Sequence, residues 1–471
     1  MILLVLCIFV ISLSIGIILI AKSNNLRAYT VFAVALFHFG LSIYLLSSHV
    51  LDIDALSKLI LITLSILYLG ITFHGIAYFS RCQFTNNNKI VTFSLIIFIV
   101  FATLMIIAND LISMWIFLET ASLACTPLIY YNENKASIEA TWKYLFLCSI
   151  GIVLALIGML FISYSAIIVG ASDTSLSFSN ILLNDKTFNQ TWLKISFVFM
   201  FIGFATKTGL FPLHSWKADA YSVEPGIFGA LMAGGVTSIS WLALMRLIQI
   251  MNAAGESTLV HSVLIFFGII SILFASISMF NQLDIKKILA YSSIEHMGII
   301  ALGLGVGGIG IFGALFHIFN NALLKGGIFI AVGNIRRAYG QKTTEFIRGA
   351  IHKIPISGTL FLVAFLAIIG TPPFGSFFSL FAIIQGSIAH SLIISLLFLL
   401  GLMLVFMGMG KTIFNASKGI PQTIETGYKD TIGMYLSPLA FLCIVLMMGL
   451  SMPDIFKKLL MDAVLVLEAN L

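Results

Sequence analysis

The chain has 471 residues, of which 60% are hydrophobic and only 9% are charged, and its formal net charge is +6. Soluble globular domains carry about 25% charged residues, so this composition excludes a soluble enzyme and indicates an integral membrane protein. The basic residues are scattered among loops and form no patch that would bind nucleic acid.

Apolar stretches long enough for a membrane helix, about 20 residues each, follow one another along the chain. The opening stretch has no basic n-region and no small-residue cleavage site, so we interpret it as a first span rather than a signal peptide. The tail, residues 453–471, predicts a short amphipathic helix at the membrane interface. About fourteen spans are expected, near residues 1–21, 28–50, 57–79, 90–108, 111–131, 142–170, 192–213, 225–250, 259–282, 286–305, 308–334, 356–384, 388–413 and 432–452.

Basic residues are divided unevenly between the loops on the two sides of the membrane. The loops after odd-numbered spans hold most of the 25 Lys and Arg residues, whereas the loops after even-numbered spans hold only Lys58, Lys186, Lys194 and Arg246. Basic loops tend to stay in the cytoplasm. The sequence therefore predicts a multi-pass protein of the cell inner (cytoplasmic) membrane with both termini on the non-cytoplasmic side.

Four charged side chains fall inside predicted spans, namely Glu119, Lys207, Glu295 and Lys325. Each costs about 2.5–3.5 kcal/mol on insertion scales, and such residues usually mark ion or proton pathways. Glu119 and Lys207 would meet if the fifth and seventh spans pack together, and a movable Glu119 would then switch the proton affinity of Lys207. The alternative is a buried ion pair that only fixes helix packing.

The eleventh span has a polar face, because His317, Asn321 and Lys325 recur every four residues. Such a ladder can hold ordered water and relay protons, since histidine titrates near neutral pH. A lone buried histidine is more often only hydrogen-bonded, but three polar residues on one apolar helix favour a functional interpretation.

The tenth span adds Glu295, with His296 alongside, eight residues after Lys287. We expect the first turn of this span to lie at the surface. Lys286 and Lys287 would then snorkel, with their stems in lipid and their ammonium groups in water.

Glycine and proline interrupt two spans, at Pro212 in the seventh and at Pro372 and Pro373 in the twelfth. Paired interruptions in corresponding halves point to a transporter with inverted repeats. Backbone groups freed inside a membrane need protein or water as partners, so water-filled channels are expected at both breaks. The predicted parts are residues 1–89 with the first three helices, 90–250 as the first repeat, 259–415 as the second repeat, and 416–471 with the last helix and tail.

No cofactor or metal site is predicted. The five cysteines are scattered, without a C-x-x-C pair or a histidine at ligand spacing, and their expected role is apolar packing. Any redox chemistry would therefore belong to partner subunits.

Several segments carry a family resemblance: LETASLACTPLIYY, EATWKYLFLCSIGI, GLFPLHSWKADAYSVEPG, DIKKILAYSSIEHMGI, FHIFNNALLKGGIFIAVGNI and GTPPFGSFFS. In this order they resemble the antiporter-like subunits of respiratory complex I, multisubunit cation/proton antiporters and membrane-bound hydrogenases, and look most like component F of hydrogenase-4. The resemblance spans roughly residues 60 to 415. It implies an all-α fold of about fourteen transmembrane helices in two inverted five-helix repeats, each with a broken helix. It also implies that Glu119, Lys207 and Lys325, with His317, line the proton pathway.

The sequence departs from the family pattern at three places. The eighth span offers only Thr and Ser where the family often has a lysine. Leu380 follows the second break where the family often has Lys or Glu, with only Gln385 beyond, and Asn321 stands where a histidine is common. Lys411 is the nearest candidate by sequence for an alternative proton exit, although a snorkelling anchor is the simpler interpretation. A water chain from Lys325 towards Glu295 and His296 is the other possibility.

The leading interpretation is a proton-translocating membrane subunit of a complex-I-like or energy-converting hydrogenase complex, at most a non-catalytic subunit of an oxidoreductase. Its expected partners are other membrane and soluble subunits, the lipid bilayer, and protons or Na⁺. The alternatives are the membrane subunit of a cation/proton antiporter or of an inorganic-carbon uptake complex, and a scaffold that anchors soluble subunits without pumping.

Overall fold

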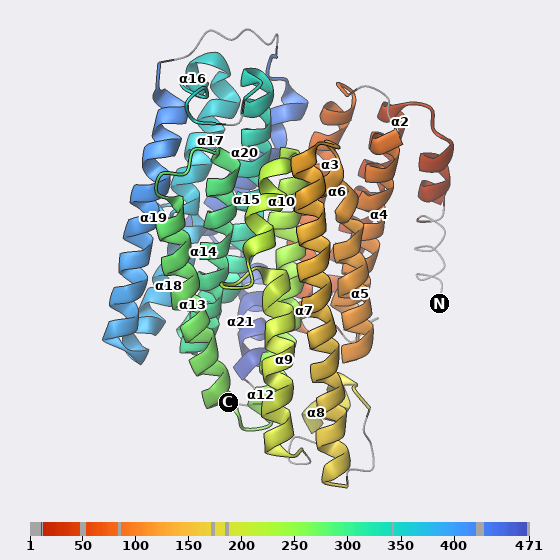
Figure 1. The fold of residues 1–471 in the computed structure, drawn as a ribbon, viewed down its shortest axis with the longest axis vertical. Coiled ribbons are helices and arrows are strands. Elements are labelled where there is room, and N and C mark those ends of the chain that lie inside the picture. The colour runs from red at the N-terminus through yellow and green to blue at the C-terminus, as the bar shows by residue number, and fades with distance from the viewer. Residues whose placement is uncertain are drawn as a thin grey trace.

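The chain forms a bundle of membrane helices in the computed structural model (Figure 1). The structure describes residue 11 and residues 13–47, 53–82, 86–170, 175–183, 188–341, 343–420 and 428–468. Within these ranges, 11 helical stretches are long and apolar enough to cross a membrane, and two shorter apolar helices follow each other at Pro355–Ile368 and Gly375–His390. The predicted all-α membrane fold is confirmed.

The helices follow the predicted spans closely. In chain order they are α2 (Asn24–Ser47), α3 (Ala55–Phe79), α4 (Asn86–Ile107), α5 (Leu111–Ala124), α6 (Thr126–Tyr130), α7 (Lys135–Ile168), α8 (Phe178–Leu183), α9 (Gln190–Thr208), α10 (Ser215–Val223), α11 (Gly226–Leu231), the π-helix η2 (Met232–Val236), α12 (Thr237–Ala253), α13 (Ser257–Met279), α14 (Ile285–Val306), α15 (Ile309–Tyr339), α16 (Ala350–Lys353), α17 (Pro355–Ile368), α18 (Gly375–His390), α19 (Leu392–Lys418), α20 (Ile432–Leu450) and α21 (Asp454–Glu468).

Some local features differ from the prediction. The fifth span is interrupted at Cys125, between α5 and α6, and the eighth contains the π-helix η2. Proline and glycine lie at both places, Pro127 just after Cys125 and Gly234 and Gly235 inside the π-helix, but the prediction placed interruptions only in the seventh and twelfth spans. Most of the predicted first span, residues 1–21, lies outside the described residues, although residues 13–20 are helical.

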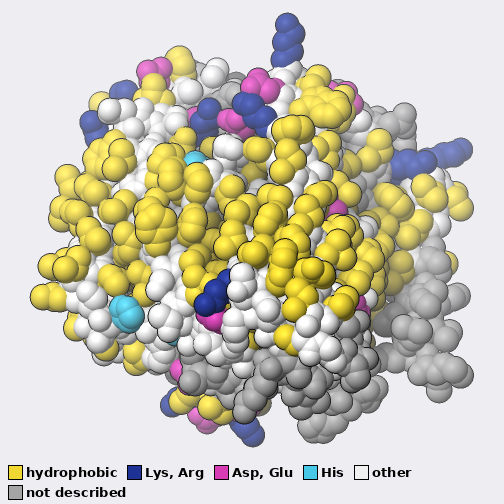
Figure 2. Space-filling model, turned by 60° about the horizontal axis from the view of Figure 1, so that its bottom comes forward, with side chains coloured by type: hydrophobic (Ala, Val, Ile, Leu, Met, Phe, Trp, Pro, Cys, Tyr) yellow, Lys and Arg dark blue, Asp and Glu magenta, His cyan; other side chains and the backbone are white. Residues whose placement is uncertain are grey.

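The central helices differ from the outer ones in burial. The most apolar windows of α15 and of the stretch Gly226–Ala253 are 100% buried inside the protein, whereas that of α19 is 33% buried. Hydrophobic side chains form a broad band across the surface, and most charged side chains lie along its margins (Figure 2). Because a charge at the centre of α15 has no access to lipid or water, it must find its partners within the bundle.

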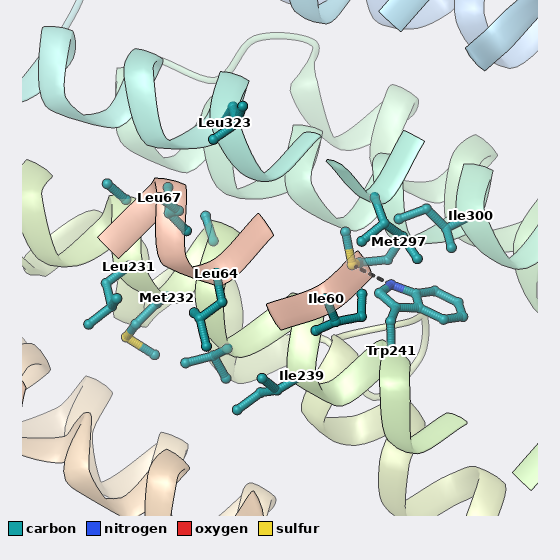
Figure 3. Packing of buried hydrophobic residues seen from close by; sticks show 14 of the residues in the cluster. Ile60, Leu64, Leu67, Leu231, Met232, Ile239, Trp241, Met297, Ile300 and Leu323 are labelled. Carbon is teal, nitrogen blue, oxygen red and sulfur yellow. Dashed lines mark hydrogen bonds between the residues drawn. The ribbon is translucent and has the colours of Figure 1, made fainter. Parts of the chain in front are cut away.

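Large apolar side chains from sequence-distant helices fill the centre (Figure 3). Ile60 and Leu64 of α3 lie beside Ile239, and Trp241 of α12 donates its indole N–H to Met297 Sδ of α14 at 3.0 Å. These contacts join the N-terminal helices to both halves of the molecule.

Two short backbone bridges mark the inverted repeats. Asp110 caps α5 and pairs with Ser177, just before α8, while Asp284 caps α14 and pairs with Thr343, after α15. Each aspartate precedes the second helix of its repeat, and each partner follows the third. The break falls in the fourth helix both times, as α9–α10 and as α17–α18. Figure 1 shows α8 and α16 at opposite ends of the bundle, as inverted repeats require.

The predicted amphipathic tail is helix α21. One side of it is buried against α3, α12 and α15, and Val466 O accepts a hydrogen bond from Gln249 Nε2 at 3.0 Å. Lys457 and Lys458 are exposed. The buried positions are Phe456, Leu460, Ala463 and Leu467.

Candidate functional site

Glu119 of α5 and Lys207 of α9 form an ion pair, as their sequence context predicts. Lys207 Nζ lies 2.5 Å from Glu119 Oε2 and 2.6 Å from the hydroxyl of Ser122, which itself donates to Glu119 Oε2 at 3.1 Å. The lysine side chain is 1% exposed and that of the glutamate 15%. The pair is therefore closed on the lysine side and partly open on the glutamate side.

The first helix break begins two residues after Lys207. Helix α9 ends at Thr208, Gly209 adopts the left-handed conformation with φ +77°, and α10 starts at Ser215, with Pro212 between them. A break leaves the last carbonyls of the helix without intrahelical donors. Side chains of α10 replace these donors. The indole of Trp216 donates to Thr206 O at 2.9 Å, and Lys217 Nζ donates to Thr208 O at 2.6 Å.

Lys217 was counted among the basic residues of the loops after odd-numbered spans, and the structure contradicts that assignment. Its side chain is completely buried. Its charge is close enough to that of Lys325 for the two to repel each other. Lys217 therefore caps the first helix break, which follows Lys207 in the chain, and is within electrostatic range of Lys325. The sequence signal was present, since Lys217 follows the break by only a few residues.

A second cluster surrounds Lys325 at the centre of α15. Lys325 is fully buried, and its Nζ donates to Ser292 Oγ of α14 at 2.8 Å. Glu295 Oε2 lies 3.5 Å from the same hydroxyl, and the charges of Glu295 and Lys325 attract each other. His296 Nε2 lies 3.9 Å from Glu295 Oε2. The structure thus brings Glu295 and His296, towards which the sequence directed a water chain, into one cluster with Lys325.

The polar face of α15 is present, but it is not a continuous chain of hydrogen bonds. His317 Nε2 pairs with His296 Nδ1 at 2.9 Å, and its Nδ1 pairs with Ser379 Oγ of α18 at 2.9 Å. Asn321 is buried, and its Oδ1 has no hydrogen-bond partner among the described residues. These hydrogen bonds therefore run sideways, from α14 through His317 to α18, rather than along α15.

The second break lies between α17, which ends at Ile368, and α18, which begins at Gly375, with Pro372 and Pro373 between them. Leu380 packs in an apolar cluster and Gln385 is exposed. The neighbouring Ser379, which the sequence reasoning missed, supplies the polar contact to His317.

Lys411, the exit candidate nearest in sequence, does not join this cluster. It is exposed on α19 and forms no hydrogen bond or ion pair within the described ranges. Lys411 was nearest along the chain only, and distance along the chain does not measure distance across the bundle. Lys286, in contrast to the exposed Lys411, is more buried than the sequence predicted. It was expected to snorkel at the surface and is 1% exposed, whereas the side chain of Lys287 is 38% exposed.

Comparison with known proteins gives consistent relatives. The family model described as NADH:quinone oxidoreductase/Mrp antiporter, transmembrane, matches residues 108–408. The hydrogenase-4 component F homolog of Methylacidiphilum infernorum is 30% identical over 348 residues, which cover 74% of this chain and 72% of the relative. The N-type subunit of the NADH-quinone oxidoreductase of Desulforudis audaxviator is 33% identical over 319 residues, 67% of this chain and 62% of the relative.

The fold has solved counterparts as well. A chain of the Mrp complex of a Dietzia species superposes with a TM-score of 0.83 at 17% identity, covering 98% of this chain and 96% of that chain. At this identity the likeness concerns the fold alone.

Proposed function

We propose a function from the family to which the chain belongs, the NADH:quinone oxidoreductase/Mrp antiporter transmembrane family. In this proposal the chain translocates protons as a membrane subunit of a complex-I-like or energy-converting hydrogenase complex. Redox chemistry in partner subunits would drive the movement. The observation that carries the proposal is the ion pair of the buried Lys207 with the partly buried Glu119, beside a helix break. A buried ion pair contributes little net stability compared with apolar packing, so its presence favours a role beyond packing.

The geometry gives each residue a role in this proposal. Separation of Glu119 from Lys207 would remove the carboxylate that favours the charged lysine, and the lysine would release its proton. Lys217 is within electrostatic range of Lys325 in the second half, so a change in the charge of one would alter the proton affinity of the other. His296 and His317 can each accept and donate a proton, and their ring contact continues to Ser379.

The proposed test is proton flux in liposomes that contain the complex purified through a tag on this chain. Glu119→Gln and Lys207→Ala should each lower the flux at least about tenfold, as expected for loss of a proton-transfer group, while the partners still co-purify. Glu139→Gln is the matched control, because it breaks an ion pair to Lys143 at 2.7 Å that is exposed. Normal flux in both pathway variants would leave the pair as a packing feature and favour the scaffold function.

A second candidate function is the membrane subunit of a cation/proton antiporter. It is favoured by relatives named as the D-type subunit of a Na⁺/H⁺ antiporter, of which that of Alkalihalophilus pseudofirmus is 25% identical over 370 residues. Identification of the co-purifying subunits separates the candidates: hydrogenase-like or quinone-reductase subunits support the first, and antiporter subunits the second. A zinc-enzyme partner would indicate inorganic-carbon uptake. A dependence of flux on Na⁺ distinguishes the transported ion.

The proposed orientation places the end with Arg336, Arg337 and Arg348 in the cytoplasm and both termini on the other side. Reporter fusions at residue 345 and at the C-terminus should then report opposite sides of the inner membrane. The same side for both would contradict this topology.

A further inference from the structure

We propose that Glu224, a buried carboxyl group next to the wall of a polar cavity, binds protons that enter the first half of the molecule from this cavity. This inference rests on the proposed proton translocation and adds an inlet to it. Glu224 lies in the link between α10 and α11, directly after the broken seventh span, and neither the sequence prediction nor the Glu119–Lys207 pair requires it.

The cavity has a volume of about 380 Å³. It reaches the basic end of the molecule, where α15 ends at Tyr339. Its wall includes Pro225 and Gly226, the two residues that follow Glu224. Most of its polar lining carries positive charge or amide groups, which suits water rather than an apolar ligand. The polar lining residues include Asn132, Lys286, Asn334, Arg336, Arg337 and Gln341.

Lys286 connects this cavity to Glu224. It lines the cavity, is 1% exposed, and its Nζ donates to the main-chain carbonyl oxygen of Glu224. The amide of Asn132 holds the same link from the other side, donating to Val223 O at 2.6 Å. The cavity wall and Glu224 are therefore adjacent, where α10, α14 and α15 meet.

The carboxylate of Glu224 is buried without a hydrogen-bond donor. The residue is 0% exposed, and within the described residues neither Oε1 nor Oε2 has a partner. Gly229 gives it room, since a Cβ there would lie 3.2 Å from Glu224 Oε1. Burying a charged carboxylate without donors is costly, so this site suits a carboxyl group that binds and releases a proton.

The groups that face Glu224 lead towards the first-half pair. Lys286 approaches from α14, and Tyr221, whose hydroxyl also has no partner in the described part of the chain, lies one turn back on α10. Cys125, at the junction of α5 and α6, lies within electrostatic range of both Glu224 and Lys207. A proton from water in the cavity would bind to the carboxylate of Glu224. The carboxyl group would then release this proton towards the Glu119–Lys207 pair and become a carboxylate again. The alternative is a carboxylate that only neutralises Lys286.

Glu224→Gln tests this, because glutamine keeps the shape and removes the proton. In the reconstituted complex, proton flux should fall at least about tenfold, the effect of losing a proton-transfer group, and Glu224→Asp should restore part of it. Glu345→Gln, at an exposed position near the same end, is the matched control. Infrared difference spectra on titration should show a carboxyl C=O band that is lost in Glu224→Gln and kept in Glu345→Gln.

The outcomes separate this inference from the proposed function. Full flux and an unchanged carboxyl band in Glu224→Gln, with flux still lost in Glu119→Gln, would overturn the inlet and leave proton translocation standing. Full flux in Glu119→Gln and Lys207→Ala would overturn proton translocation itself. Loss of flux in Glu224→Asp as severe as in Glu224→Gln, with an unchanged carboxyl band, would identify a packing role and overturn the inlet.

Discussion

The two helix breaks occupy equivalent places in the two repeats but satisfy their backbone in different ways. Each follows a left-handed glycine, Gly209 with φ +77° and Gly370 with φ +80°. At the first break an ammonium group caps a freed carbonyl, from Lys217 to Thr208 O at 2.6 Å. At the second, hydroxyl groups do so: Ser376 Oγ donates to Ala367 O at 2.5 Å, and Thr371 Oγ1 donates to Leu366 O at 2.9 Å.

The residues just before the breaks differ in the same sense. Lys207 precedes Gly209 by two positions, and the apolar Ile368 precedes Gly370 by two. The first half thus concentrates charge at its break, in the ion pair of Lys207 with Glu119. The second half keeps its lysine on the unbroken α15, and His317 of that helix is hydrogen-bonded to Ser379, which follows the second break. If the chain translocates protons as proposed, this difference predicts charge separation in the first half and transfer along hydrogen bonds in the second.

Lys325→Ala gives the largest expected effect on this comparison. It removes the charge that Ser292 and Glu295 surround, so the second half would lose its central proton carrier. Flux through the reconstituted complex should fall at least about 100-fold, with assembly checked by co-purification. If Lys325→Ala translocates protons like the wild type, the second half conducts nothing and the contrast between the halves disappears.

Lys217→Met compared with Ser376→Ala sharpens the difference between the breaks. Each variant leaves one freed carbonyl without its donor, which costs about 1–3 kcal/mol for a buried group. Both should therefore lower the melting temperature in detergent to a similar extent. Only Lys217→Met removes a charge between the halves, so only it should lower flux, by about tenfold. Equal flux in the two variants would reduce Lys217 to a backbone cap.

Much of this arrangement, but not all of it, could be predicted from the sequence. The sequence predicted the meeting of Glu119 with Lys207 because each is a lone charge in an apolar span, and such charges must pair. It predicted the breaks because proline and glycine act locally. It missed Lys217 and Glu224, since helical periodicity is lost across a break. It could not show that His317 reaches Ser379, because α15 and α18 are distant in sequence and meet only in the folded bundle.

The ion pair of Arg246 with Asp54 offers a comparison between a pair that stabilises packing and one that is proposed to transfer protons. Arg246 binds Asp54 at the start of α3 with two contacts, of 2.5 and 2.8 Å. Burial alone would raise the pKa of Asp54, but the hydrogen bond and charge of Arg246 outweigh it and hold the pKa below its usual value. This pair lies apart from the residues proposed for proton transfer.

Asp54→Asn should lower stability without lowering flux, unlike Glu119→Gln. The loss is expected to be about 2 kcal/mol, typical of hydrogen bonds to charged groups. Since the folded pKa is depressed, the stabilisation is present above the unfolded value of about 3.9 and is lost as pH falls through the folded pKa. Melting temperatures of the wild type and Asp54→Asn should therefore converge in acid. A tenfold loss of flux in Asp54→Asn would place this pair on the pathway.

Lys411→Ala should have the smallest effect, and it tests where the second half ends. Lys411 is exposed on α19, so its removal should change flux by no more than about twofold, as for most surface substitutions. Ser379→Ala, by contrast, takes the hydroxyl away from His317 Nδ1 in a buried site and should lower flux several-fold at unchanged assembly. If instead Lys411→Ala loses most of its flux and Ser379→Ala none, protons leave over α19. In that case Ser379 only fixes the orientation of the His317 ring. The second half would then depend on the charge of Lys411 at its outlet, as the first half depends on the charge of Lys207 at its break.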